Sequence, residues 1–210
     1  IALALLLIPA IVFMVGCGGG RSTTVTVGGS TTVQPVAEKL AKAFIDENPD
    51  VTIIVQGGGS STGVSKCADG TFDIGTASRE LKPGERELMT YLLARDGIAI
   101  VTHSGNDVTG LTTDQVRDIY EGSITNWGEV GGSDEGIIVI AREEGSGTRD
   151  AFEELVMDGE LITAEAILQT SNGALRTAVA NTPYSIGFLS FGYLTDSVKS
   201  LSVDGVAGTA

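Results

Sequence analysis

In the first half of the chain, short β-branched runs alternate with longer segments whose apolar residues recur every three or four positions. The runs at 24–27, 51–55 and 72–78 predict strands. The segments at 35–48 and 63–69 have helical spacing, and Pro35 suits the first turn of the former. The repeated order of strand, loop and helix is typical of an α/β fold with parallel strands.

The second half of the chain repeats the same alternation. Apolar runs predict strands at 97–103, 137–141 and 185–189. Helices are expected at 111–120, where Thr112 or Thr113 can act as the N-cap, and at 148–157 and 172–179. The pattern therefore predicts a second block of strand and helix units, with no long linker between the two blocks.

Three glycine-rich segments follow apolar runs and precede predicted helices. They are GGSTTV at 28–33, GGGSSTG at 57–63 and REEGSGTR at 142–149. Glycine lets backbone approach a ligand closely, the first N–H groups of a helix lack intrahelical partners, and hydroxyls add further donors. Each cluster alone could be an ordinary turn, but together they indicate a site for a small oxyanion.

The positions of these clusters suggest how they meet. Ligands of strand–helix–strand sheets bind outside the carboxyl ends of the strands. Clusters near residues 30, 60, 78 and 146 belong to different units of the chain. We therefore expect two α/β lobes that face each other across a ligand cleft.

Composition narrows the classes of partner. The formal net charge of −14 disfavours nucleic acid and anionic membrane surfaces. It does not exclude a small anion, because salt screens the global field beyond about 8 Å while donors in a closed site act at contact distance. One histidine and two separated cysteines give no metal-ligand spacing, so we expect no metal and no cofactor.

The first residues have the character of an export signal. Residues 1–16 are almost entirely apolar and lead into Cys17, which resembles the lipidation site of bacterial lipoproteins. We expect an incomplete signal at 1–16, a lipid on Cys17, and a tether at 17–23. The protein would then be anchored at the cell surface or in the periplasm, whereas the alternative is an ordinary membrane anchor.

Two enzymatic readings of the glycine clusters are weak. The segment 57–63 lacks the Gly-Lys-Ser/Thr of a nucleotide phosphate loop, because Val64 stands where lysine is needed. Ser146 as a nucleophile would need a base, and the one histidine, His103, ends an apolar strand. We therefore expect no enzymatic activity.

The motifs resemble those of the phosphate-binding proteins that serve ABC phosphate importers, a branch of the two-lobed periplasmic binding proteins. The resemblance rests on GSTTVQP at 29–35, GGGSSTG at 57–63, DIGTASR at 73–79, IYEGSITNW at 119–127 and REEGSGTR at 142–149. It implies a periplasmic-binding-protein type II fold, phosphate as ligand and importer permease subunits as partners. A monomer is expected.

The resemblance also implies a set of ligand contacts. Some family members place an aspartate where this chain has Ser78, and a carboxylate accepts the proton of hydrogen phosphate while a hydroxyl discriminates less. Arg79 and Arg149 could contact the anion or pair with acids, and we favour Arg79 near the cleft. The expected phosphate contacts are Ser30, Thr31, Thr32, Ser60, Ser78, Arg79, Arg142, Ser146, Gly147 and Thr148.

The same resemblance predicts the lobe boundaries. We expect lobe 1 to comprise 24–98 plus 190–210, and lobe 2 to comprise 99–189. Family members usually continue beyond the segment that matches 201–206, so we expect an incomplete lobe 1. Two alternatives stay open for the function: a phosphate-sensing or adhesive surface protein of this fold, and a carrier of another tetrahedral oxyanion such as sulfate.

Overall fold

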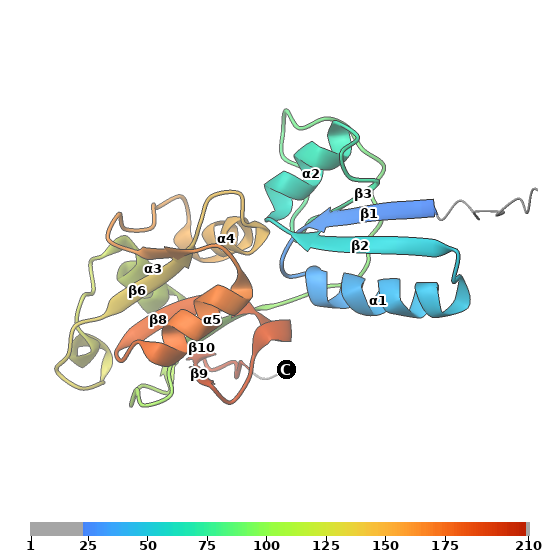
Figure 1. Ribbon diagram of the computed structural model, residues 1–210. Coiled ribbons are helices and arrows are strands. Elements are labelled where there is room, and N and C mark those ends of the chain that lie inside the picture. The colour runs from blue at the N-terminus through green and yellow to red at the C-terminus, as the bar shows by residue number, and fades with distance from the viewer. Residues whose placement is uncertain (1–22, 209–210) are drawn as a thin grey trace, which may run out of the picture.

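The first three predicted strands and two predicted helices build lobe 1 of the computed structural model, which describes residues 23–208 (Figure 1). The three strands are parallel and lie in the order β2-β1-β3. Parallel pairing places the carboxyl ends of the strands, and the loops that follow them, at one edge. The elements are β1 (Thr23–Gly29), α1 (Gln34–Glu47), β2 (Val51–Gly57), α2 (Ser60–Ala68) and β3 (Ile74–Thr76).

Close packing of α2 on the sheet depends on glycine. A Cβ atom at Gly63 would collide with the carbonyl oxygen of Thr76 and would lie 2.9 Å from the Cα atom of Gly29. Gly29 itself has a φ of +134°, a conformation that residues other than glycine rarely adopt. The first turn of α2, which begins at Ser60, is thereby held against the ends of β1 and β3.

Lobe 2 contains a mixed five-stranded sheet in the order β7-β6-β8-β4-β9. Strand β8 runs parallel to β6 and antiparallel to β4. The prediction of strands and helices in this half is confirmed, and Thr112 is the N-cap of α3, within a capping box that includes Gln115. The elements are β4 (Ile98–His103), β5 (Gly110–Leu111), α3 (Thr113–Glu121), β6 (Ile138–Arg142), α4 (Gly147–Phe152), β7 (Ile167–Gln169), α5 (Asn172–Asn181), β8 (Ser185–Ser190), β9 (Val198–Ser200) and β10 (Ser202–Val203).

Several short elements of lobe 2 were not expected from the sequence. Helix α4 continues as a π-helical segment (Glu153–Met157), and 3₁₀ helices occur at Trp127–Val130 and Phe191–Tyr193. Strands β5, β7, β9 and β10 have two or three residues each, too few for a readable periodicity.

The main core lies in lobe 2 and is built around aromatic side chains. Phe152 stacks on Phe188 with ring centroids 4.1 Å apart, and Tyr120 lies 4.6 Å from Phe152. All three side chains are fully buried. Trp127 is buried too, and its indole N–H donates to the carbonyl of Tyr184 at 2.8 Å. This packing anchors the end of α4 and the middle of β8 in the lobe 2 core.

The last segment departs from the expected lobe boundaries. Strand β9 pairs with β4, and β10 pairs with β5, so residues 198–203 belong to lobe 2 and not to lobe 1. Leu201, which is 1% exposed, joins the lobe 2 core, and this burial accounts for the placement. The expected return of 190–210 to lobe 1 is therefore corrected for 198–208 by this structure.

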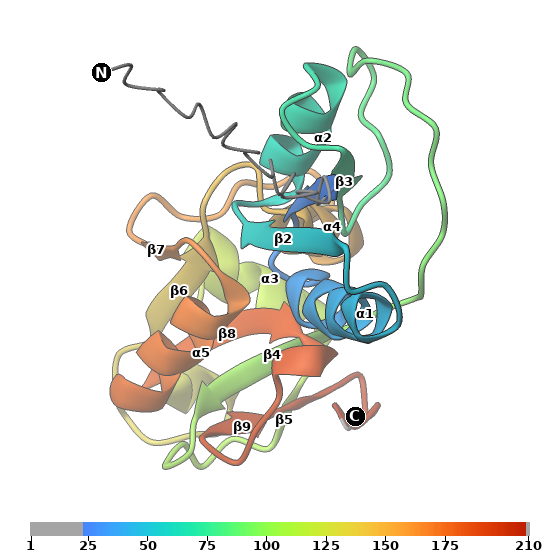
Figure 2. The same cartoon turned by 45° about the vertical axis from the view of Figure 1, so that its right-hand side comes forward.

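The chain crosses from lobe 1 to lobe 2 once within residues 23–208. The crossing segment, 77–97, has no regular helix or strand and runs beside α2 and α1 of lobe 1 before it enters β4 (Figure 2). Across the described part of the chain, no helix combines the length and apolar character needed to cross a membrane. The expected signal at 1–16, the lipid site at Cys17 and most of the tether lie outside the described residues.

We predict that Phe152→Ala destabilises lobe 2 by about 3 to 5 kcal/mol, because it removes a buried ring and leaves a cavity between Tyr120 and Phe188. Urea unfolding followed by tryptophan fluorescence measures the change, since Trp127 lies in the same core. Leu155→Ala, at an exposed position nearby, is the control and should change stability little. A loss below 1 kcal/mol for Phe152→Ala would contradict this description of the core.

Candidate anion-binding site

The three glycine-rich loops meet where the two lobes touch. The backbone N–H of Ser61, at the start of α2, donates to the carbonyl of Gly145 at 3.1 Å. The hydroxyl oxygens of Thr32 and Thr148, from the first and third loops, lie 3.0 Å apart. Segments more than 110 residues apart in the sequence therefore form one polar cluster. The predicted convergence of the three loops is confirmed.

Arg142 lies at the end of β6 and is the cation buried most deeply among the described residues, at 1% exposure. Its Nε donates to the carbonyl of Gln169 at 3.0 Å, and Nη2 donates to the carbonyl of Thr170 at 3.1 Å. Nη1 is buried without a hydrogen-bond partner. None of the ion pairs formed by residues 23–208 includes Arg142.

The electrostatics of Arg142 follow from this geometry. Burial lowers the pKa of its guanidinium from the ordinary value, and the nearby Glu143 and Tyr193 oppose that change. An arginine stays protonated at any relevant pH, so the site keeps a buried positive charge. Two carbonyls orient the guanidinium without neutralising it, which leaves its Nη1 hydrogens available to a ligand.

Three serine hydroxyls of the site accept hydrogen bonds from backbone N–H groups. Ser30 Oγ accepts from the N–H of Thr32 at 3.2 Å, and Ser60 Oγ accepts from the N–H of Ser78 at 3.0 Å. Ser146 Oγ caps α4 by accepting from the N–H of Arg149 at 3.3 Å. Among the described residues the hydroxyls of Ser30 and Ser146 make no other hydrogen bond, so their O–H groups are available to an acceptor ligand with negative charge.

Gly147 allows the lobes to approach. A Cβ atom at this position would collide with the hydroxyl oxygens of Ser60 and Ser78. These two oxygens lie 3.3 Å apart, and both come from lobe 1, whereas Gly147 opens α4 of lobe 2. The glycine therefore places the unpaired N–H groups at the start of α4 directly beside two serine hydroxyls.

Asn172 was missed by the sequence reasoning. It is fully buried at the start of α5, accepts from the N–H of Ser190 through Oδ1 at 3.2 Å, and donates to Thr32 Oγ1 at 2.9 Å. Its Nδ2 also lies 3.4 Å from the Thr31 hydroxyl. The available signal was a fourth polar loop, SNG at 171–173, between an apolar segment and a helix.

Tyr193 was missed as well, because nothing in its sequence context indicates a contact with lobe 1. Its hydroxyl donates to the carbonyl of Thr31 at 2.6 Å. Burial raises the pKa of this phenol, with Glu38 adding to the effect, so the hydroxyl stays protonated. Tyr193 therefore supports the first loop from lobe 2 as a neutral donor.

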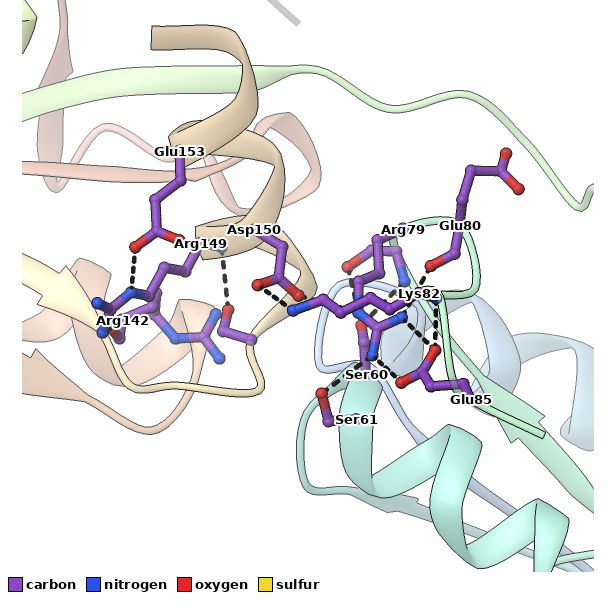
Figure 3. Close-up of polar contacts among 12 residues, drawn as sticks. Ser60, Ser61, Arg79, Glu80, Lys82, Glu85, Arg142, Arg149, Asp150 and Glu153 are labelled. Carbon is purple, nitrogen blue, oxygen red and sulfur yellow. Dashed lines mark hydrogen bonds and ion pairs between the residues drawn. The ribbon is translucent and has the colours of Figure 1, made fainter. Parts of the chain in front are cut away.

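Arg79 lies at the lobe boundary, as favoured from the sequence, but its guanidinium is engaged by acids. It pairs with Glu85 at 2.6 Å and with Asp150 at 2.9 Å (Figure 3). Arg149 similarly pairs with Glu153 at 2.7 Å and donates to the carbonyl of Arg142. Of the two roles left open for these arginines, the structure shows pairing with acids. We therefore leave Arg79 out of the ligand set proposed below.

The arrangement offers several hydrogen-bond donors to an anion. His103 lies at the end of β4, where its Nδ1 accepts from the N–H of Gly105 at 3.1 Å. Within residues 23–208 no cluster of three metal-ligating side chains is found. The chemistry that this site supports is recognition of an acceptor by a buried cation, several hydroxyls and helix N–H groups.

A family model for the PBP superfamily domain matches residues 18–209, so the chain belongs to this superfamily. Among its relatives is the phosphate-binding protein PstS of Bacillus subtilis, 38% identical over 190 residues that cover 88% of this chain and 63% of that protein. The chain thus spans less than two thirds of this relative's length. PstS of Borreliella burgdorferi is 29% identical over 88% of the chain and 70% of its own length.

Solved structures agree with the fold. A Clostridium perfringens structure, described as a phosphate ABC transporter substrate-binding protein with bound phosphate, has a TM-score of 0.83 and 43% identity, covering 89% of this chain and 78% of that one. An ABC-type phosphate transport receptor from Vibrio cholerae has a TM-score of 0.69 and 38% identity, covering 88% and 78%. The expected two-lobed α/β binding-protein fold is confirmed.

We predict that Gly147→Ala holds the two lobes apart, because the added methyl group would overlap the hydroxyls of Ser60 and Ser78. Distances between spin labels placed on α1 and α5 measure the separation. Gly173→Ala is the matched control, since a Cβ there would make only ordinary contacts, with a ring carbon of Tyr193 at 3.7 Å and the hydroxyl oxygen of Ser171 at 3.9 Å. An unchanged distance distribution in Gly147→Ala would contradict the close approach described here.

Proposed function

We propose that this protein binds inorganic phosphate between its lobes and delivers it to an ABC-type phosphate importer. The observation that carries the proposal is Arg142, a buried guanidinium with an unpartnered Nη1 and no carboxylate in ion-pair contact among residues 23–208. An isolated buried charge is costly because it has lost its hydration, and a bound anion would offset that cost.

Neutral donors around Arg142 fit a tetrahedral oxyanion. The proposed ligand set consists of Ser30, Thr31, Thr32, Ser60, Ser78, Arg142, Ser146, Gly147 and Thr148. Ser30, Ser60 and Ser146 are each at most 2% exposed, so water competes poorly for their hydrogens. The planar guanidinium of Arg142 and the O–H and N–H groups that converge beside it match the oxygens of phosphate in geometry and charge. The phosphate-binding relatives support this choice of anion.

Sulfate is the second candidate, and Ser78 is the observation that favours it. No residue of the proposed ligand set carries a carboxylate that could accept the proton of hydrogen phosphate or repel sulfate. The half-buried hydroxyl of Ser78, 3.3 Å from that of Ser60, can donate or accept. Discrimination between the two anions then depends on hydroxyl orientation and is weaker than with an acidic residue.

The cellular setting of the proposal follows from the first residues and from the relatives. An export signal at 1–16 and a lipid on Cys17 would hold the protein at the outer face of the membrane, within reach of permease subunits. A monomer suffices, because both lobes of the site belong to one chain. A phosphate-sensing or adhesive surface protein would keep the site but not the delivery step, so an assay of importer-dependent uptake separates these roles.

Calorimetric titration with phosphate and then with sulfate, at pH 7, tests the ligand. Tight phosphate binding with negligible heat from sulfate supports phosphate transport and implies an effective proton acceptor despite Ser78. Comparable binding of both anions supports a general oxyanion carrier. Absence of binding by either anion would overturn the proposal.

We predict that Arg142→Ala weakens phosphate binding by about 100-fold or more, exceeding the effect of any single hydroxyl deletion, because the buried anion loses its countercharge. Arg117→Ala is the matched control: it removes another lobe 2 guanidinium, which bonds the carbonyl of Val156 far from the ligand set. An Arg142→Ala variant that binds phosphate as tightly as the parent would contradict this assignment.

A further inference from the structure

A cluster of four charged side chains bridges the lobes beside the candidate site and is not used by it. Lobe 1 contributes Arg79, Lys82 and Glu85, and lobe 2 contributes Asp150 from the first turn of α4 (Figure 3). Lys82 Nζ lies 2.8 Å from Asp150 Oδ1. Arg79 Nε lies 2.9 Å from Asp150 Oδ2, as an ion-pair contact whose angle falls outside hydrogen-bond geometry.

The cluster is asymmetric with respect to lobe separation. Arg79 is also held by Glu85 of its own lobe, through two contacts of 2.6 and 2.9 Å. Asp150 makes two ion pairs, and both are with lobe 1. The neighbouring cation of lobe 2, Arg149, pairs with Glu153 instead. Separation of the lobes would therefore leave Arg79 paired but would strip Asp150 of both cations.

The two halves of the cluster are attached to the ligand loops. Arg79 Nη2 donates to the hydroxyl of Ser61 at 3.0 Å, next to Ser60 in the second glycine loop. Asp150 lies two residues after Thr148, in the same helical turn that the third loop opens. Asp150 thus contacts the two cations in the same placement of the lobes that brings Gly147 against Ser60 and Ser78.

Burial determines how strongly this contact resists solvent. The side chains of Arg79 and Asp150 are 6% and 19% exposed, whereas Lys82 is 49% exposed. A pair buried to this degree is screened less by salt than a surface pair. The hydrogen bond from Arg79 lowers the pKa of Glu85 to about 2, so the carboxylate that orients Arg79 stays charged at neutral pH.

We propose that Arg79, Lys82 and Asp150 form a closing latch, a positioning element that contacts no ligand and holds the lobes in the anion-binding register. This inference rests on the proposed function, because it assigns to the latch the lifetime of the closed, anion-bound state. The latch forms whenever the lobes close, with or without an anion between them, and must break before a bound anion leaves. It therefore controls dissociation far more than association.

The test compares Asp150→Asn with the parent protein by stopped-flow measurement of phosphate association and dissociation. We expect the dissociation rate to rise about tenfold and the association rate to change less than twofold, since the two ion pairs of Asp150 are lost only from the closed state. Asp46→Asn is the matched control, because it removes an exposed ion pair on α1, remote from the lobe boundary, and should change neither rate.

A double-mutant cycle separates the latch from a local effect on α4. Lys82→Met, Asp150→Asn and the double variant should show non-additive dissociation rates, with Asp150→Glu restoring most of the parent behaviour. Lys42→Met is the control for Lys82→Met. Additive effects, or a dissociation rate in Asp150→Asn equal to that of the parent, would overturn the proposal. So would a lowered Tm that accounts for the whole change.

A measurement without phosphate keeps the latch distinguishable from the proposed function. Spin-label distances between α1 and α5 should shift toward longer values in Asp150→Asn and stay unchanged in Asp46→Asn. If the parent protein binds no phosphate and this shift is still seen, the proposed function fails while the latch stands. If phosphate binds and neither the distances nor the dissociation rate change, the latch fails alone.

Discussion

The site depends on one uncompensated charge. Arg142 is carried into the lobe boundary by β6, is oriented by the carbonyls of Gln169 and Thr170, and has no acidic partner in ion-pair contact among residues 23–208. A carboxylate there would satisfy the guanidinium and remove the reason for a ligand. The surrounding hydroxyls and glycines place neutral hydrogen-bond donors close to that charge without adding a countercharge.

The protein has a net charge of −14, so an anion can be attracted only by a local positive potential. The glycine and hydroxyl residues of the loops contribute to that potential by bringing N–H and O–H donors close to Arg142. At contact distance, a buried guanidinium and oriented N–H and O–H dipoles outweigh acids that water and salt screen. Three of the acids near the boundary are paired with arginines: Glu85 and Asp150 with Arg79, and Glu153 with Arg149. Pairing of these acids with arginines keeps negative charge out of the ligand set.

Sequence pattern predicted the units that are locally encoded. Apolar periodicity indicated the major strands and helices, and the glycine loops indicated an oxyanion site, because both signals lie within short segments. Contacts that join distant segments were not predictable in this way. Asn172 bridges to the hydroxyls of Thr31 and Thr32 from 140 residues away, and β9 joins β4 through packing of Leu201. Arg79 could not be assigned without knowing which acids face it.

The pairing of Arg79 with Glu85 has a consequence for the cost of domain motion. Because Glu85 fixes Arg79 while the lobes are apart, the guanidinium loses little rotamer freedom when Asp150 arrives. The exposed side chain of Lys82 and the short side chain of Asp150 are then left to be ordered on closure. Closure thus resembles the docking of two rigid surfaces. The side-chain conformational entropy of Arg79 is lost when lobe 1 folds, so it does not oppose closure.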